Sequence, residues 1–297
     1  MEHTPVLLRE ALESLDPKSG EVVIDVTLGL GGHAMGFLER IGSKGRLIGI
    51  DADQKNLETS RKNLQGKNVT LIYGNFRDLP ILLSQVRSTA GTAVPQCDIL
   101  FADLGLSSVH IDDPLRGFTF RSVSPLDCRF DQMSGRPASA LLSEASEGEL
   151  LRIFTEYGEL PNVRLFVQAI LAERGAKRLE RSSDLVLLAE KVFTWRTKKF
   201  LPQIFQALRI AVNDEIGALS VLLEHGPLLL SQGGRMGVIS YHSLEDRMVK
   251  ERFSGLTQGG KLASYELLTK KPIKPTMEEV GRNPRSRSAI LRILKKL

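Results

Sequence analysis

Short apolar runs alternate with helical stretches along the first hundred residues of the chain. The runs are rich in β-branched residues and three of them end in aspartate, which is typical of buried parallel strands. We expect strands at residues 21–25, 46–51, 69–74 and 97–103. Helical periodicity predicts helices between them, at residues 33–41 and 54–64. Strands separated by helices imply right-handed βαβ crossovers and therefore a parallel sheet.

The pattern changes after the fourth strand. Residues 107–136 are rich in Ser, Asp, Pro and Arg, and we expect a long loop there. Helical periodicity then dominates, over residues 138–142, 147–156, 163–174, 183–193 and 203–222. The earlier pattern returns near the C-terminus, with a strand at 235–241, a helix at 244–253 and a strand at 288–294.

These elements predict an α/β fold in which one doubly wound, mostly parallel sheet is interrupted by a helical insertion. Residues 1–106 and 207–297 would form the discontinuous sheet domain, and residues 107–206 the inserted helical domain.

The amino-acid composition is consistent with this predicted fold. Of the 297 residues, 42% are hydrophobic and 25% charged, as in ordinary soluble globular proteins. Apolar runs stay below the ~18–20 residues that a membrane span needs, and the N-terminal fifteen residues lack the features of a secretory signal. Cys97 and Cys128 lie far apart, and the five histidines show no ligand spacing. We therefore expect a cytoplasmic protein with no membrane partner and no metal site.

Positive charge is concentrated in two segments. Residues 164–209 hold ten basic and four acidic residues, and residues 270–297 hold nine basic and two acidic, within a net charge of +5. Because Lys and Arg bind phosphates with release of counterions, two basic segments on an otherwise acidic chain favour a polyanionic partner. Solvated surface charge is the alternative.

A glycine-rich turn follows the first expected strand and includes Gly29, Gly31 and Gly32. Such a turn lets a ligand approach the backbone closely at the start of a helix. Asp25 precedes it, however, and a carboxylate there would repel a pyrophosphate. It suits a ligand that carries an ammonium or sulfonium group, and S-adenosylmethionine carries both.

Residues at the ends of the second and third expected strands are candidates for contact with a nucleotide. Asp51 ends the second strand 20 residues after Gly31, where a carboxylate accepts hydrogen bonds from ribose hydroxyls. Phe76 follows the third strand and could stack on an adenine ring, although a place in the core would explain it equally well.

Asp103 ends the fourth strand, so three carboxylates would face the crevice beyond the strand ends. Their mutual repulsion calls for a cationic or hydroxyl-rich ligand. This coincidence favours a sulfonium cofactor.

Seven motifs, in order along the chain, resemble those of the MraW/RsmH family, the bacterial 16S rRNA cytosine-N4 methyltransferases. They run from residue 3 to about residue 294. They are His3–Leu8, Gly29–His33, Asp103–Ser108, Arg116–Phe118 with Pro125–Asp127, Phe205–Ile210 with Val212–Asn213, Tyr241–Arg247 and Asn283–Ser288.

The resemblance implies a class I, Rossmann-like methyltransferase that uses S-adenosylmethionine and methylates a cytidine of 16S rRNA near the decoding centre. The substrate would be small-subunit rRNA within an assembled or assembling 30S subunit, with homodimerisation left open. The implied cofactor contacts are Gly31, Gly32, His33, Asp51, Phe76, Asp103 and His110. His110 stands where the family pattern has Gln.

The implied chemistry requires a group that accepts an amino proton, because the cytosine amino lone pair is delocalised into the ring. Asp103 is the first candidate for this acceptor, and His242 with Ser243 is the second. A packed or helix-capping role is the alternative for His242. The target base must also leave its stack to reach a pocket.

Two other classes of protein share parts of this pattern. An NAD(P)-dependent oxidoreductase would have a regularly spaced glycine motif with no acid before it, and Asp25 argues against that class. A non-catalytic RNA-binding protein would have lost the acids at the strand ends, and all three are present.

Ligand binding distinguishes a methyltransferase from an NAD(P)-dependent oxidoreductase. Saturating S-adenosylmethionine should raise the melting temperature, because a ligand that binds only the folded state stabilises it by about 2.7 kcal/mol at a hundred times its Kd. NADH at the same concentration should leave it unchanged. A thermal-shift assay measures both, and stabilisation by NADH alone would contradict the cofactor assignment.

Overall fold

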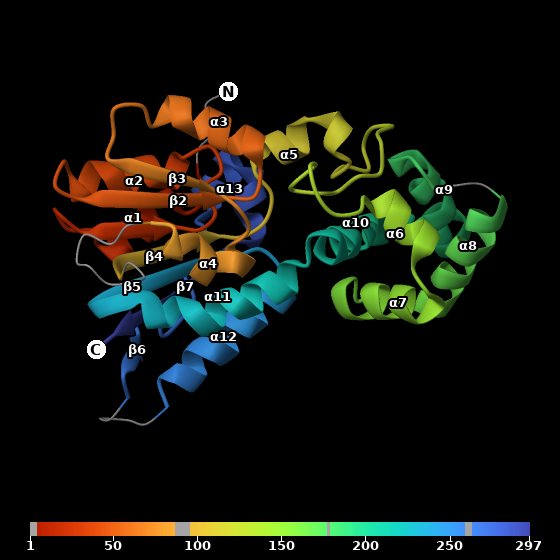
Figure 1. The fold of residues 1–297 in the computed structure, drawn as a ribbon. Helices are drawn as coiled ribbons and strands as arrows, with labels where there is room; N and C mark the ends of the chain where they lie inside the picture. Colours follow the sequence, from red (N-terminus) through yellow and green to blue (C-terminus); the bar gives the residue numbers. More distant parts are fainter. Residues whose placement is uncertain (1–4, 87–95, 177–178, 259–262) are drawn as a thin grey trace. The chain divides into compact units, whose positions relative to one another are not determined.

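The computed structural model describes residues 5–86, 96–176, 179–258 and 263–297. The chain divides into two compact units, residues 1–105 with 217–297 and residues 106–216 (Figure 1). The first boundary lies one residue from the expected one. The second lies ten residues later than expected, because the helix that crosses residue 206 continues to Asn213 in the second unit.

The first unit contains a seven-stranded sheet with the order β3-β2-β1-β4-β5-β7-β6. Its strands are β1 (Val22–Asp25), β2 (Arg46–Asp51), β3 (Val69–Tyr73), β4 (Cys97–Asp103), β5 (Leu230–Ser240), β6 (Tyr265–Leu267) and β7 (Ile290–Lys296). The first five are parallel, and β7 runs antiparallel to both β5 and β6. The expected doubly wound, mostly parallel sheet is therefore confirmed.

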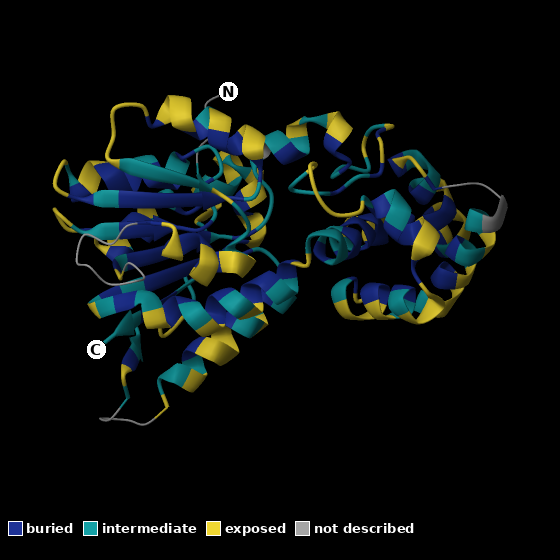
Figure 2. Cartoon of the chain, in the orientation of Figure 1, coloured by how far each residue is buried: buried dark blue, intermediate teal, exposed yellow. Residues whose placement is uncertain are grey.

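Helices cover both faces of this sheet because successive strand residues point to opposite sides. Val23 and Leu47 pack with α1 (Leu8–Leu15), α2 (Gly32–Ile41) and α3 (Gln54–Asn63). Ile24 and Ile48, one residue further along, pack with helices on the other face. These helices are α4 (Leu79–Ser84), α11 (Glu215–Leu229) and α12 (Ser243–Leu256). Figure 2 shows the central strands buried between the two layers.

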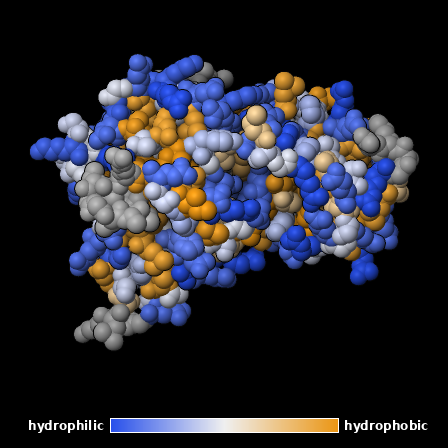
Figure 3. Space-filling view, viewed as in Figure 1, coloured by the Kyte–Doolittle hydropathy of each residue, from blue (hydrophilic) through white to orange (hydrophobic). Residues whose placement is uncertain are grey.

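Short elements complete the first unit. They are the 3-10 turns η1 (Phe76–Asp78) and η6 (Pro284–Ser288) and the helix α13 (Met277–Arg282). On the face of the molecule drawn in Figure 3, hydrophilic residues predominate and apolar residues form scattered patches among them. Within the described residues, no helix is both long enough and apolar enough to span a membrane.

The second unit is helical and has a core of its own, which includes Leu142, Phe154, Phe166 and Ile204. Its elements are α5 (Ser108–Asp112), η2 (Pro114–Arg116), α6 (Ala138–Glu144), α7 (Glu147–Arg152), the π-helical turn η3 (Ile153–Tyr157), α8 (Val163–Ala176), α9 (Ser182–Phe193), η4 (Thr194–Arg196) and α10 (Thr197–Asn213). The stretch expected as a loop, residues 107–136, therefore contains a short helix and a 3-10 turn.

The expected single helix over residues 203–222 is wrong. α10 ends at Asn213, and Asp214 adopts the left-handed conformation (φ 46°, ψ 49°) before α11 begins. Asp tolerates this conformation better than most residues. Arg209 then binds Glu215 across the corner through two hydrogen bonds of 2.7 and 2.9 Å. Hydrophobic periodicity continues through this corner, so it could not reveal the break.

Candidate active site

Three carboxylates lie at the carboxyl ends of adjacent strands. Asp25, Asp51 and Asp103 are the last residues of β1, β2 and β4, and β1 lies between the other two in the sheet. Asp25 is 1% exposed and Asp51 9%. Burial raises the pKa of Asp25 to about 7, and the nearby charge of Asp51 raises it as well. A cluster of acids in this position favours a positively charged ligand.

Asp51 holds the glycine-rich turn in place. One carboxylate oxygen accepts a hydrogen bond from the backbone N–H of Gly29 at 2.7 Å. The other accepts from the backbone N–H of Asp53 at 2.8 Å and from the side chain of Asn56 at 3.2 Å. Gly31 then precedes α2 as its N-terminal cap, with φ of +85°, a conformation that glycine adopts readily. The predicted ribose contact of Asp51 would add to these bonds.

Gly32 and His33 contact the N-terminal segment. A Cβ atom on Gly32 would lie 2.4 Å from Cγ of Pro5, so only glycine allows this approach. His33 is buried, and its Nε2 donates to the carbonyl oxygen of Val6 at 2.9 Å. Its other ring nitrogen, Nδ1, lies 3.6 Å from Oδ2 of Asp103. His33 therefore lies between the N-terminal segment and the end of β4.

Two neighbours hold Asp103 by hydrogen bonds. Its Oδ1 accepts a hydrogen bond of 2.7 Å from the hydroxyl of Tyr241, and its backbone N–H donates to Oγ1 of Thr27 at 2.6 Å. The backbone N–H of Thr27 in turn donates to Asp25 at 3.1 Å. Burial raises the pKa of Asp103 to about 7, and the charges of Asp25 and Glu245 act in the same direction. The hydrogen bond from Tyr241 opposes this shift.

Phe76 is the first residue of η1, which follows β3. Its ring is partly buried and packs against the apolar core that also contains Leu79 and Leu82. The ring therefore helps to cover this core, and its stacking on adenine stays a prediction.

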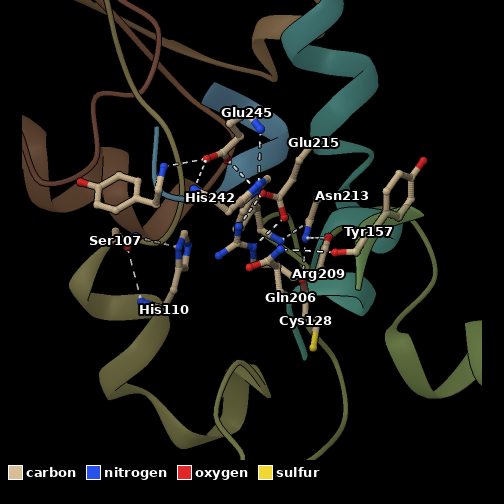
Figure 4. A network of polar contacts seen from close by, with 12 residues as sticks. Ser107, His110, Cys128, Tyr157, Gln206, Arg209, Asn213, Glu215, His242 and Glu245 are labelled. Carbon is tan, nitrogen blue, oxygen red and sulfur yellow. Dashed lines mark hydrogen bonds and ion pairs between the residues drawn. The ribbon is translucent and has the colours of Figure 1, made fainter. Parts of the chain in front are cut away.

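His110 belongs to the helical unit. Its Nδ1 accepts from the backbone N–H of Ser107 at 3.2 Å, and Oγ of Ser107 accepts from the backbone N–H of His110 at 3.4 Å (Figure 4). The imidazole stacks on Phe130 and lies against Phe118, each with ring centroids 5.2 Å apart. These contacts fix the ring at the start of α5, and its cofactor contact stays a prediction.

His242 caps α12. Its Nδ1 accepts from the backbone N–H of Glu245 at 3.4 Å, and the Glu245 carboxylate accepts from the backbone N–H groups of Tyr241 and His242 (Figure 4). Ser243 is the first residue of the helix and is exposed. This geometry gives His242 the capping role that was the alternative to catalysis, and the proton-accepting role of the pair stays a prediction.

Sequence reasoning missed two residues that contact the carboxylates. Tyr241 directly follows β5, the sheet neighbour of β4, so its place at a strand end could have identified it. Thr27 lies in the turn after β1, where nothing in the sequence distinguishes it from a residue that only shapes the turn.

Comparisons with known proteins identify the family of this chain. The model of the MraW methylase family matches residues 1–297. A protein of Thermomicrobium roseum is 40% identical over 99% of this chain and 94% of its own length. One of Azobacteroides pseudotrichonymphae is 40% identical over 99% of this chain and 97% of its own length. Both are named ribosomal RNA small subunit methyltransferase H.

Similar solved structures include an rRNA methylase from Streptococcus thermophilus, with a TM-score of 0.41 and 12% identity over 98% of this chain and 93% of that one. Fibrillarin from Aeropyrum pernix, in complex with S-adenosylmethionine, has a TM-score of 0.42 and 10% identity over 93% of this chain and 67% of that one. A methylase requires a methyl donor, and the expected S-adenosylmethionine is consistent with the three acids at the strand ends. The match along its whole length shows that this chain belongs to the MraW methylase family.

Proposed function

We propose that this chain uses S-adenosylmethionine to methylate the exocyclic N4 amino group of a cytidine in 16S rRNA, near the decoding centre. The observation that carries the proposal is the cluster of Asp25, Asp51 and Asp103 at the ends of three adjacent strands. The names of the 40% identical relatives support small-subunit rRNA as the substrate. The resemblance of the motifs to the cytosine-N4 methyltransferases supports the N4 position.

The residues present fit a cationic cofactor. Asp25 and Asp103 both have a pKa raised to about 7, chiefly by burial and further by nearby carboxylates. A positive charge between them would favour their ionised forms and offset this repulsion. When bound, S-adenosylmethionine supplies an electrophilic methyl group on a sulfonium. Gly31, Gly32 and Asp51 would hold its amino-acid and ribose parts, Phe76 its adenine, and His33 and His110 would complete the contacts.

Asp103 would accept a hydrogen bond from the target amino group. An acceptor for one amino hydrogen localises the nitrogen lone pair and aligns it with the methyl carbon. Because the pKa of Asp103 is raised to about 7, its carboxylate is a stronger base than an ordinary aspartate and is ionised above that pH. Acceptance of the proton should therefore improve as the pH rises through the pKa of Asp103, which a bound cation lowers from about 7.

The helical unit would bind the RNA. Ten basic and four acidic residues lie between residues 164 and 209, which is a charge suited to phosphate contacts. The predicted substrate domain, residues 107–206, lies within this unit. Its role would be to position the rRNA, within an assembled or assembling 30S subunit, while the base leaves its stack.

Asp51→Asn should weaken cofactor binding by ~1–3 kcal/mol, the usual cost of losing a hydrogen bond to a charged group. The new amide also brings an N–H group against the donors of Gly29 or Asp53, which disturbs the turn. Titration calorimetry with S-adenosylmethionine measures the loss. Asp16→Asn, at an exposed carboxylate after α1, is the matched control and should bind as the native chain does. Equal affinities in all three proteins would contradict the assignment.

The chemistry is tested by product mapping. Incubation of 30S subunits with the protein and S-adenosylmethionine should yield N4-methylcytidine in 16S rRNA, identified by mass spectrometry of nucleosides and of fragments. Asp103→Asn should lower the rate of methylation more than the cofactor affinity, because the amide keeps the shape but loses the charge and one acceptor oxygen. A different methylated nucleoside would contradict the N4 assignment, and equal losses of rate and affinity would limit Asp103 to a cofactor role.

A further inference from the structure

The contacts around His33 fix which of its nitrogens carries a proton. A carbonyl oxygen only accepts hydrogen bonds, so the Nε2 that lies 2.9 Å from the carbonyl oxygen of Val6 must be protonated. In the neutral ring, Nδ1 then has a lone pair, and this atom lies 3.6 Å from Oδ2 of Asp103. Nδ1 therefore faces the carboxylate at ion-pair distance, and a proton that reached it would form an imidazolium beside Asp103.

The second oxygen of Asp103 is held by a hydroxyl. Tyr241 donates to Oδ1 at 2.7 Å, and its own backbone N–H donates to Oε2 of Glu245 at 2.8 Å. Its ring packs close to Gly105, where a Cβ atom would lie 3.3 Å from Cδ2. Burial raises the pKa of Tyr241 well above its ordinary value, so the hydroxyl stays a donor at physiological pH.

We propose that His33 and Tyr241 act through Asp103: Tyr241 positions the carboxylate, and His33 receives the proton that the carboxylate takes from the target amino group. This inference rests on the proposed function. The amino nitrogen gains the methyl group as the bond from sulfur to methyl breaks, and it loses one proton. That proton passes to Oδ2 of Asp103 and then to Nδ1 of His33, which becomes an imidazolium.

Charge balance favours this route. The methyl donor begins as a cation and ends as a neutral thioether, so the acids around it lose their counter-charge when the methyl group leaves. An imidazolium at His33 restores one positive charge beside Asp103. Among the described residues, the other groups whose charge raises the pKa of Asp103 or Tyr241 are Asp25 from β1, Glu245 from α12 and Glu279 from α13, all of them acids. Their negative charge stabilises an imidazolium in this place.

Two variants test the proposal, with single-turnover methylation of 30S subunits measured across pH at saturating cofactor. His33→Gln keeps a side-chain donor for the carbonyl of Val6 but has no basic nitrogen. We expect its rate at saturating cofactor to fall ~100-fold, the lower end for loss of general acid–base catalysis, which is a larger loss than the loss of cofactor affinity from the missing His33 contact. Tyr241→Phe removes a hydrogen bond that lowers the pKa of Asp103. The pKa of Asp103 should therefore rise in this variant, and the methylation rate should begin to increase at a higher pH than in the native chain.

Tyr265→Phe is the matched control, because it removes a hydroxyl that donates to the carbonyl of Pro227 at 3.1 Å, away from these residues. Its pH profile should match that of the native chain. A purely structural role would lower the rate of Tyr241→Phe without moving its profile, and that result would overturn the proposal. So would a His33→Gln variant that loses affinity and rate equally.

Infrared spectroscopy separates this inference from the proposed function, since it needs no methylation. The band of the protonated carboxyl group that disappears in Asp103→Asn should titrate at higher pH in Tyr241→Phe than in the native chain. If the carboxyl group of Asp103 titrates at the same pH in both proteins, the inference is overturned even if the product is N4-methylcytidine. If it titrates at a higher pH in Tyr241→Phe, the coupling of Tyr241 to Asp103 is supported, whichever nucleoside is methylated.

A second, independent observation concerns the surface of the helical unit. The single tryptophan of the chain, Trp195, lies in η4 between α9 and α10 and is 80% exposed. The guanidinium of Arg196 lies 4.5 Å from the centroid of its ring. Lys198 and Lys199 follow directly and are also exposed. An exposed large aromatic ring with cationic neighbours is the combination that binds unpaired nucleotides.

The backbone holds this ring at a strained corner. Thr194 adopts φ of 50° and ψ of −125°, which a β-branched residue rarely does. Its carbonyl accepts a hydrogen bond of 2.6 Å from the hydroxyl of Thr197, and Thr197 is buried at the start of α10. Strain of this kind persists where the surrounding structure enforces it, and it is concentrated at functional sites.

We infer that Trp195 stacks on an unpaired base of the rRNA, while Arg196, Lys198 and Lys199 contact neighbouring phosphates. This inference also rests on the proposed function, but it concerns RNA binding and not the reaction. Stacking tolerates any base, so the ring would add affinity without specifying sequence.

The single tryptophan makes the test direct, because intrinsic fluorescence reports on this ring alone. A single-stranded oligoribonucleotide should quench it, and the same sequence in a duplex should quench it less. Trp195→Ala should weaken binding of the single strand, measured by anisotropy, and Trp195→Phe should recover part of the loss. Lys198→Glu with Lys199→Glu should make the plot of log K against log salt shallower by ~0.7 for each lost phosphate contact.

Three results would overturn this second inference. RNA binding without quenching would place the contact elsewhere. Native affinity in Trp195→Ala would show that the ring contributes nothing. Quenching by intact 30S subunits but not by protein-free rRNA would identify a ribosomal protein as the partner. Each result leaves the proposed methylation untouched, because nucleoside mapping measures that separately.

Discussion

Repulsion among three carboxylates, two of them buried and one partly buried, is the constraint around which the sheet unit is organised. Asp25, Asp51 and Asp103 meet because the carboxyl ends of β2, β1 and β4 are neighbours in a parallel sheet. Their hydrogen-bond donors come from three segments: the turn after β1 donates to Asp25 and Asp51, the start of α3 donates to Asp51, and the hydroxyl of Tyr241 donates to Asp103. Without these donors, and without a cation, acids at such short range would drive one another to the neutral form.

His33 connects this cluster to the beginning of the chain. It lies between the carbonyl of Val6 and the carboxylate of Asp103, while the backbone N–H of Leu7 donates to Glu279 of α13 at 2.7 Å. The first described residues are thus bound by one contact to the glycine turn and by another to a helix near the C-terminus. Gly32 allows this packing, since any side chain there would meet Pro5.

The sheet, its parallel part and the three acids could be predicted from the sequence. The reason is that each apolar run and the aspartate that ends it are adjacent in the chain. It did not reveal β6, which has three residues, or the break at Asp214, where the helical pattern simply continues. The bonds from Tyr241 and Thr27 to Asp103 were missed for another reason. Both bonds join segments far apart in the chain, and only the folded backbone brings these segments together.

The split of the sheet unit along the chain has a consequence for its synthesis. β4 can pair with β1 on one side as soon as it is made, but its other side must wait for residues 230–240 of β5. The helical unit, by contrast, is one continuous segment that is complete once residue 216 has been made. On the ribosome the helical unit can therefore fold first, while the half-built sheet keeps β4 as an exposed edge. Because Tyr241 directly follows β5, the site at the strand ends is completed only once β5 has joined the sheet beside β4.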